Sequence, residues 1–145
     1  MKKTQKKLGN KGFSLVELIV VIAIMAVLVG VLAPTLIKNI EKSRESKDAQ
    51  NCEQIKSAAE IALQNEDAYA DNVVTGGKEL VTIDSSGVSI KTTANATTGK
   101  DAFKDEFEGQ IDTTKTKLTS KKYKAANIKI KVNEKGQVSI EGIPS

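Results

Sequence analysis

One carboxylate stands at the beginning of the longest apolar run of the chain, directly after a lysine-rich start. The junction contains Gly12, Phe13 and Glu17, and the twenty residues Leu18 to Ile37 that follow carry no charge. At about 1.5 Å per residue, such a helix is about 30 Å long, which is the thickness of the hydrocarbon core of a bilayer. The run therefore predicts a membrane-spanning helix. Glu17 is a candidate functional residue because a carboxylate at the edge of such a helix is costly without a partner.

The chain has few residues that suit catalysis. The chain has no histidine, and Cys52 is its single cysteine. A serine or cysteine nucleophile would need a lysine or carboxylate as its base, and no local motif proposes one. Thr98-Gly99-Lys100 lacks the upstream glycine of a phosphate-binding loop and predicts a turn. We therefore expect no enzyme activity and no cofactor, and the single cysteine excludes an intrachain disulfide.

Five acidic residues gather between Asp101 and Asp112 and are the candidate for metal binding. Their spacing does not match an EF-hand loop, so we expect a solvated acidic helix face and no metal site. Asn95-Ala96-Thr97 matches the glycosylation acceptor pattern, but a motif this short in a threonine-rich loop is weak evidence for a glycan.

The net charge of +4 comes from the first residues of the chain. Residues 1–12 carry five of the 22 basic side chains and none of the 18 acidic ones, so the remainder holds 17 basic and 18 acidic residues. No basic excess is left there to neutralise phosphates, and we expect no direct nucleic-acid binding. Lysines before an apolar run hold the N-terminus in the cytoplasm and send the C-terminal part outward.

An ordinary secretory signal peptide is the alternative interpretation of this start. Its peptidase would cut after the apolar run, near Val31-Leu32-Ala33, but Pro34 follows directly and disfavours that cleavage. An uncleaved anchor, or cleavage at Gly12, fits the sequence better.

The first forty residues closely resemble type IV pilins and their prepilins, a family that includes the pseudopilins of secretion and DNA-uptake machines. The resemblance rests on the segment Lys11 to Leu18, the aliphatic stretch after it and Pro34. It implies that a prepilin peptidase cuts between Gly12 and Phe13 and N-methylates Phe13, and that Glu17 is needed for assembly. It also implies an assembly ATPase and an inner-membrane platform protein as partners. In lacking a cysteine pair, the chain resembles pilins of Gram-positive bacteria.

Cleavage before Phe13 would create an amine at the start of a helix, where the macrodipole is already positive, and methylation would keep this charge. Glu17 of a neighbouring subunit could pair with that amine and remove two charges from an apolar filament core. Alternatively, Glu17 pairs with Phe13 of its own chain or extends toward the lipid headgroups. We favour the pairing between subunits.

Gly30 and Pro34 interrupt an otherwise strong helix-forming sequence. A proline removes one backbone hydrogen bond and costs about 3 kcal/mol in a helix interior. We expect a helix break here, either a kink or unwound residues, which would let the packed helix extend or bend under load. A kink without a mechanical role is the alternative.

The resemblance implies an α+β, type IV pilin-like fold, in which a long N-terminal helix packs on a small antiparallel β-sheet. We divide the chain into a leader (1–12), a hydrophobic transmembrane or filament-core helix (13–37), an amphipathic continuation (38–68) and a β-rich globular head (69–145). The helix is expected from near Phe13 to about Asp67, with Cys52 as a small buried hydrophobe on its apolar stripe.

Two antiparallel hairpins are expected in the head. Residues 80–83 and 88–90 flank a turn at Asp84-Ser85-Ser86-Gly87, and residues 128–132 alternate cleanly before a second turn and residues 138–140. Residues 92–99 predict a loop. A short helix over 102–107 would place Phe103 and Phe107 near the core.

Two classes of function follow. The first is a filament subunit, mainly a major pilin, that lies in the membrane as a single-pass prepilin and is then part of an extracellular homo-oligomeric helical filament for adhesion, motility or surface attachment. A pseudopilin of a DNA-uptake or type II secretion machine is the alternative within that class. The second is a membrane-tethered surface module that keeps residues 1–12 and does not polymerise.

Overall fold

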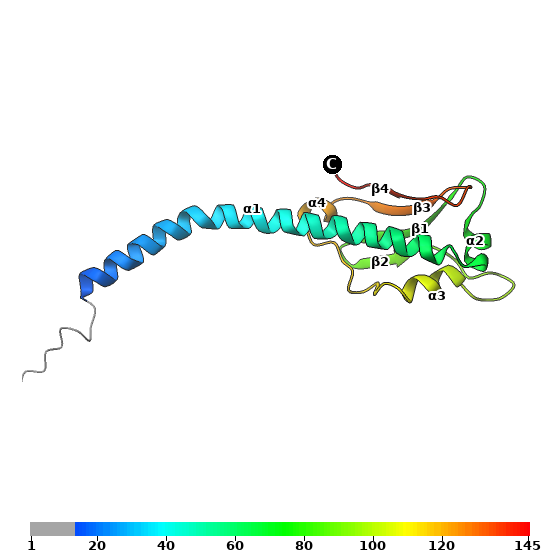
Figure 1. Cartoon of the computed structure of the whole chain (residues 1–145), viewed down its shortest axis with the longest axis horizontal. Coiled ribbons are helices and arrows are strands. Elements are labelled where there is room, and N and C mark those ends of the chain that lie inside the picture. The colour runs from blue at the N-terminus through cyan, green and yellow to red at the C-terminus, as the bar shows by residue number, and fades with distance from the viewer. Residues whose placement is uncertain (1–13) are drawn as a thin grey trace, which may run out of the picture. The chain divides into compact units, whose positions relative to one another are not determined.

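A computed structural model describes residues 14–145 (Figure 1). The predicted leader (1–12), which includes Gly12, and Phe13 lie outside the described residues. The contacts between residues divide the chain into an N-terminal unit, Met1–Ile40, and a globular unit, Glu41–Ser145. Helix α1 (Leu15–Ala62) contributes residues to both units.

In the N-terminal unit, the described residues from Leu15 onward are helical without interruption. Leucine and alanine favour a helix, and the many valines and isoleucines lower its intrinsic propensity only slightly, through lost χ1 freedom. Helix α1 includes Pro34 in its interior and continues through Gly30. Unwound residues, one of the two forms of helix break that we expected, are therefore absent at Gly30 and Pro34. Proline costs the helix a single hydrogen bond, and the turns on either side keep theirs.

In the globular unit, α1 is amphipathic as predicted. Its buried residues recur at spacings of three and four, which places them on one face: Asp48, Cys52, Ile55, Ala58, Ala59 and Ala62. The helix ends at Ala62 and not near Asp67. Asn65 has an extended backbone, and its side chain accepts hydrogen bonds from the N–H groups of Asp67 and Ala68, so it starts a second helix, α2 (Glu66–Asn72).

Four strands form one antiparallel sheet in the order β2-β1-β3-β4. Their bounds are β1 (Lys78–Asp84), β2 (Gly87–Ile90), β3 (Ile128–Val132) and β4 (Val138–Glu141). Both predicted hairpins are confirmed, with Ile83 opposite Val88 in the first and Ile130 opposite Ile140 in the second. The hairpins join through β1 and β3, where Ile83 lies opposite Ile128.

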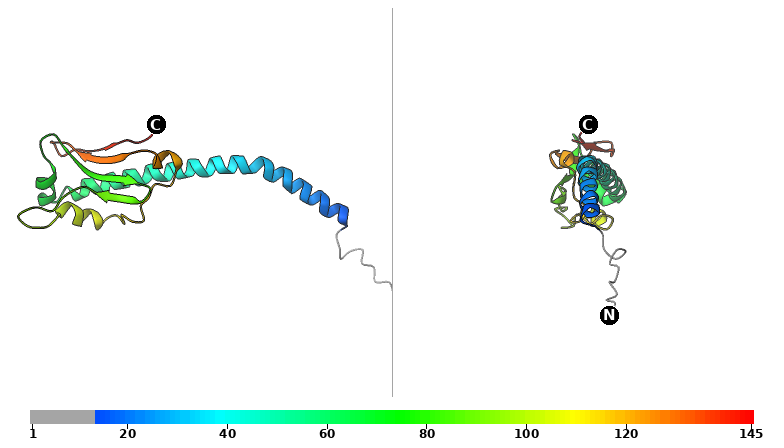
Figure 2. Two further views of the ribbon diagram at one scale, coloured as in Figure 1. Left: turned by 180° about the vertical axis from the view of Figure 1, so that it is seen from behind. Right: turned by 90° about the vertical axis from the view of Figure 1, so that its left-hand side faces the viewer.

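One hydrophobic core joins the sheet to α1. Strand β3 alternates as predicted, with Ile128, Ile130 and Val132 buried and the lysines between them half-buried. The core also includes Cys52 and Ile55 of α1. The fold is thus α+β, with a long N-terminal helix packed on a small antiparallel sheet, and Figure 2 shows the C-terminal half of α1 running alongside the strands.

Two short helices complete the globular unit. Helix α3 (Ala102–Glu108) confirms the predicted helix, and its Phe103 and Phe107 are fully buried with ring centroids 5.5 Å apart. Helix α4 (Lys121–Lys124) was not expected. Ser120 caps α4 by accepting the Tyr123 N–H. Tyr123 is the one apolar residue of this helix, and its side chain is buried in the core.

Candidate functional site

The first turn of α1 is closed by Ser14 and Glu17. The Ser14 Oγ accepts the Glu17 N–H at 3.3 Å, and the Glu17 Oε2 accepts the Ser14 N–H at 3.4 Å. This reciprocal pair is a capping box, which satisfies two of the donors that a helix start leaves open. Ser14 was not among the predicted site residues. Its signal was available, because serine followed three residues later by glutamate and then an apolar run marks a helix start.

Glu17 is exposed and only partly used by this cap. Its one contact to Ser14 is long for a charge-assisted hydrogen bond, which usually measures 2.7 to 2.9 Å. Within residues 14–145, its Oε1 accepts no hydrogen bond and no cation pairs with it. The geometry therefore leaves Glu17 able to accept a further donor. Its pairing with Phe13 of its own chain falls outside the described residues.

The apolar residues after Glu17 present bare hydrocarbon all round the helix. The 18-residue window with the highest mean hydropathy, 3.1, has none of its residues buried, and the helix is long and apolar enough to cross a membrane. Side chains such as Val27 and Val31 are both 67% exposed. A surface of this size is not stable in water, so it needs lipid or other helices around it.

Gly30 and Pro34 are one hydrogen-bond step apart. Proline has no N–H, so the Gly30 carbonyl lacks the partner that it would have four residues later. A Cβ atom placed on Gly30 would meet no other atom within 4 Å, so nothing in the described part of the chain requires glycine there for space. The two residues share one weak point in an otherwise uniform helix.

The acidic residues on either side of α3 have local roles. Asp101 caps α3 by accepting the Lys104 N–H, and also accepts the Thr92 hydroxyl at 2.6 Å. Asp112 accepts the Thr114 N–H and hydroxyl. Within residues 14–145, no group of three or more candidate ligands is arranged to hold a metal ion.

Asn95 of the predicted glycosylation motif is held inside its loop. Its Nδ2 donates to Asp71 Oδ1 at 2.6 Å, and its Oδ1 accepts the N–H groups of Thr97 and Thr98. The Nδ2 that would carry a glycan is thus already a hydrogen-bond donor that ties the loop to α2. A glycan at Asn95 stays an untested alternative.

Asp48 is a buried carboxylate that the sequence analysis missed. It accepts the Thr119 N–H at 3.0 Å, the Thr119 hydroxyl at 3.1 Å and the Ser120 N–H at 2.7 Å, and it is 0% exposed. These bonds fasten the segment before α4 to α1. The pKa of the nearby Cys52 thiol is raised to about 11, mainly by burial and further by the negative charges of Asp48 and Glu53. This fits the predicted role of Cys52 as a buried hydrophobe.

Comparisons with known proteins address the N-terminal site. Residues 7–33 match the family model described as the prokaryotic N-terminal methylation motif. The prepilin peptidase-dependent protein A of Clostridium perfringens is 34% identical over 104 residues, which are 71% of this chain and 70% of that protein. The type IV major pilin protein PilA of Myxococcus xanthus is 32% identical over 62 residues, 43% of this chain and 28% of that protein. No solved structure matches significantly.

Proposed function

Because this chain belongs to the family of type IV pilins and prepilin-like proteins, we propose that it is the major structural subunit of a type IV pilus. One observation carries the proposal: the match to the methylation motif, residues 7–33, extends into a helix whose apolar residues are exposed on every side. Such a helix can lie in lipid as a single molecule and can exchange lipid for neighbouring helices in a filament. The filament would serve adhesion, motility or surface attachment.

Processing is the first step of the proposed function. We infer that a prepilin peptidase cuts between Gly12 and Phe13 and methylates the new amine of Phe13. The match to the methylation motif supports this step, as does a relative that is named as dependent on prepilin peptidase. Before the cut, the lysine-rich leader holds the N-terminus in the cytoplasm. Afterwards, the helix of residues 13–37 is free to leave the membrane.

Assembly is the second step, and it gives Glu17 its proposed role. The amine of Phe13 would lie at the positive end of α1 and would need an anion in an apolar filament core. Glu17 of an adjacent copy supplies this anion, and its free oxygen and exposure support the assignment. Formation of that pair fixes how far one copy is displaced along the next.

Other proteins must drive this polymerisation. We propose an assembly ATPase and an inner-membrane platform protein as partners, and a non-enzymatic role for the chain itself. Gly30 and Pro34 would give the packed helix a point of extension under load, since the Gly30 carbonyl lacks a partner in α1. The chain would be a single-pass membrane protein first and part of an extracellular filament later.

Two substitutions test the two steps separately. Gly12→Val should block the cut, so that the mature mass, lacking residues 1–12 and carrying one methyl group, is not found. Glu17→Ala should permit the cut and abolish fibres. Mass spectrometry reads the first step and electron microscopy the second.

A wild-type chain that keeps residues 1–12 would contradict the proposal and favour the membrane-tethered module. Long surface fibres with this chain as their bulk constituent would separate a major pilin from a pseudopilin. Normal fibres from the Glu17→Ala strain would contradict the role of Glu17 alone.

A further inference from the structure

Three exposed lysines lie in helix α4, and a fourth lies just before it. They lie in a stretch that has no acidic residue between Asp112 and Glu134. In the described part of the chain, none of the four takes part in an ion pair. We call this set the lysine surface: Lys117, Lys121, Lys122 and Lys124.

Two carboxylates of α1 near the lysine surface are engaged with backbone groups. Glu41 accepts the Lys121 N–H at 2.6 Å, and Asp48 accepts the N–H groups of Thr119 and Ser120. These bonds hold the backbone of the segment against α1. The lysine side chains remain directed at solvent, on a support that packing and hydrogen bonds keep in place.

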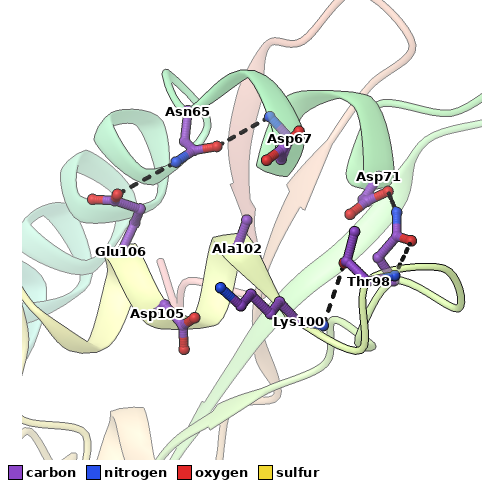
Figure 3. Close-up of a pocket in the computed structure, with 9 residues that line it drawn as sticks. Asn65, Asp67, Asp71, Thr98, Lys100, Ala102, Asp105 and Glu106 are labelled. Carbon is purple, nitrogen blue, oxygen red and sulfur yellow. Dashed lines mark hydrogen bonds between the residues drawn. The ribbon is translucent and has the colours of Figure 1, made fainter.

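A pocket of about 400 Å³ between α2, α3 and the loop before α3 has the opposite charge (Figure 3). Four carboxylates and one lysine line it, and we call this set the acidic pocket: Asp67, Asp71, Asp105, Glu106 and Lys100. Asn95 donates to Asp71, and Asn65 donates to Glu106 at 3.4 Å. In residues 14–145, the carboxylates of Asp67 and Asp105 accept no hydrogen bond and no ion pair.

The lysine surface and the acidic pocket lie at opposite ends of the globular unit. Figure 1 and the left view of Figure 2 both place α4 at one end of this unit, and α2 and α3 at the other. Four basic groups thus stand at one end and four acidic groups at the other. Surfaces that complement each other on different parts of one molecule form heterologous contacts, which repeat from copy to copy without closing.

From this arrangement, we propose that the lysine surface of one copy docks on the acidic pocket of a second copy. The inference rests on the proposed function, because a filament supplies the repeated copies. A second copy accounts for both charged ends at once, whereas an anionic lipid surface would account for the lysines alone. Exposed charges of this kind set partner and register more than total affinity, and salt screens them.

Charge reversal at each end tests the inference in the full chain expressed in its host. Lys121→Glu with Lys122→Glu should lower the amount of surface fibres at least about tenfold, because like charges then meet across the contact. Asp67→Lys with Asp105→Lys should do the same. The four changes together restore the attraction with its sign inverted, so fibres should return to within about twofold of the unaltered level.

A matched control keeps the change in net charge and moves it elsewhere. Lys91→Glu with Lys135→Glu alters two exposed lysines outside the lysine surface and should leave the fibres unchanged. The amount of processed chain in the membrane fraction shows whether each variant folds and is retained. Normal fibres from either reversal, or a four-residue variant that does not regain fibres, would overturn the inference.

A cysteine pair gives a second reading that does not depend on charge reversal. Cys52 is buried, and Cys52→Ser removes it as a competitor. In that background, Lys122→Cys in one copy and Asp105→Cys in another should form a disulfide-linked dimer in oxidised fibres. Lys91→Cys with Asp105→Cys should not. Absence of the first dimer in intact fibres would contradict the contact.

The outcomes separate this inference from the proposed function. If the unaltered chain forms no fibres, the proposed function fails, and the inference fails with it. If the unaltered chain forms fibres that reversal does not affect, the inference alone fails. Binding of the processed chain to phosphatidylglycerol vesicles, lost on Lys121→Glu with Lys122→Glu while the acidic-end variant still forms fibres, would assign the lysine surface to lipid and also overturn the inference.

Discussion

The two halves of α1 obey the same backbone rules and differ completely in what surrounds them. Between Leu15 and Ile37, no residue is buried, although nearly all are apolar. Between Glu41 and Ala62, a charged and polar sequence buries one stripe of small residues against the sheet. The difference shows that the apolar surface of the polar half is covered within one molecule. The surface of the apolar half is not covered, and it requires lipid or further copies.

Two carboxylates sharpen this comparison. Asp48 is fully buried and accepts bonds from Thr119 and Ser120 within its own chain. Glu17 is exposed, and within residues 14–145 its carboxylate accepts one hydrogen bond, a long one from the Ser14 N–H. Removing one partner of a hydrogen bond lowers stability most when the other partner, a charge or a donor, is left buried and unpaired. We therefore expect Asp48 to act on the stability of the globular unit and Glu17 on assembly.

The largest effect is expected from Glu17→Gln. Glutamine can still close the capping box with Ser14, so α1 keeps its start, but it cannot neutralise an amine. Fibres should be lost while the chain is still cut and methylated, as electron microscopy and mass spectrometry would show. Ser14→Ala is the matched control: it removes the cap, costs about 1 kcal/mol of helix stability and should leave fibres present. Fibres in the Glu17→Gln strain would mean that the cap, and not the charge, is what assembly needs.

Asp48→Ala should have the next largest effect, on the globular unit. The N–H groups of Thr119 and Ser120 would lose their acceptor in a buried place, which should lower the free energy of unfolding by about 3 kcal/mol. Urea unfolding of the processed chain in detergent, followed through tyrosine fluorescence, measures it. Glu45→Ala removes a half-buried acid of the same helix and should cost less than about 1 kcal/mol. Equal losses for both variants would contradict the role of Asp48.

Cys52 offers a test of burial on the polar half of α1. Burial raises the pKa of its thiol from 9.0 to about 11, which leaves about a hundredfold less thiolate near pH 8. Native chain should therefore react with iodoacetamide at least about a hundred times more slowly than chain in urea. Ser57→Cys in a Cys52→Ser background places an exposed thiol close by and should react at the rate of the unfolded chain. Rapid alkylation of native Cys52 would mean that the core opens easily.

The smallest effect is expected at the turn between β1 and β2. Hydrogen bonds from the Ser86 hydroxyl and N–H hold the pKa of Asp84 below its ordinary value of 3.8. A lowered pKa stabilises the fold above pH 3.8, and this stability is lost as the pH falls through the folded-state value. Unfolding midpoints measured between pH 5 and pH 2 should fall less steeply for Asp84→Asn than for the unaltered chain. Identical slopes would assign the acid sensitivity to other carboxylates.

Local patterns in the sequence predicted most of the fold. Alternation in residues 128–132 and turn residues at Asp84 to Gly87 predicted both hairpins, and the spacing of Cys52 and Ile55 predicted the buried stripe. The end of α1 was placed too late, because Asn65 was not recognised as a cap. Capping side chains decide helix bounds, and periodicity alone does not contain them.

The contacts that no local pattern contains were missed. Asp48 follows a highly charged stretch, and its burial depends on Thr119 and Ser120, which lie more than seventy positions away. Helix α4 was not predicted, because it is four residues long and only Tyr123 within it is apolar. At the N-terminal site, the type and position of Glu17 made it a candidate, and its role in assembly stays a prediction. Its relation to Gly12 and Phe13 stays a prediction.

The bond between Asp48 and Ser120 also constrains when the globular unit can form. Ribosomes deliver a chain from its N-terminus, so Asp48 emerges 72 positions before the N–H that it must accept. Until then, the apolar stripe of α1 has no sheet to cover it, because β3 and β4 come later still. A nascent copy therefore passes through an interval in which both halves of its longest helix are uncovered. During that interval, lipid or a chaperone must shield it from premature association.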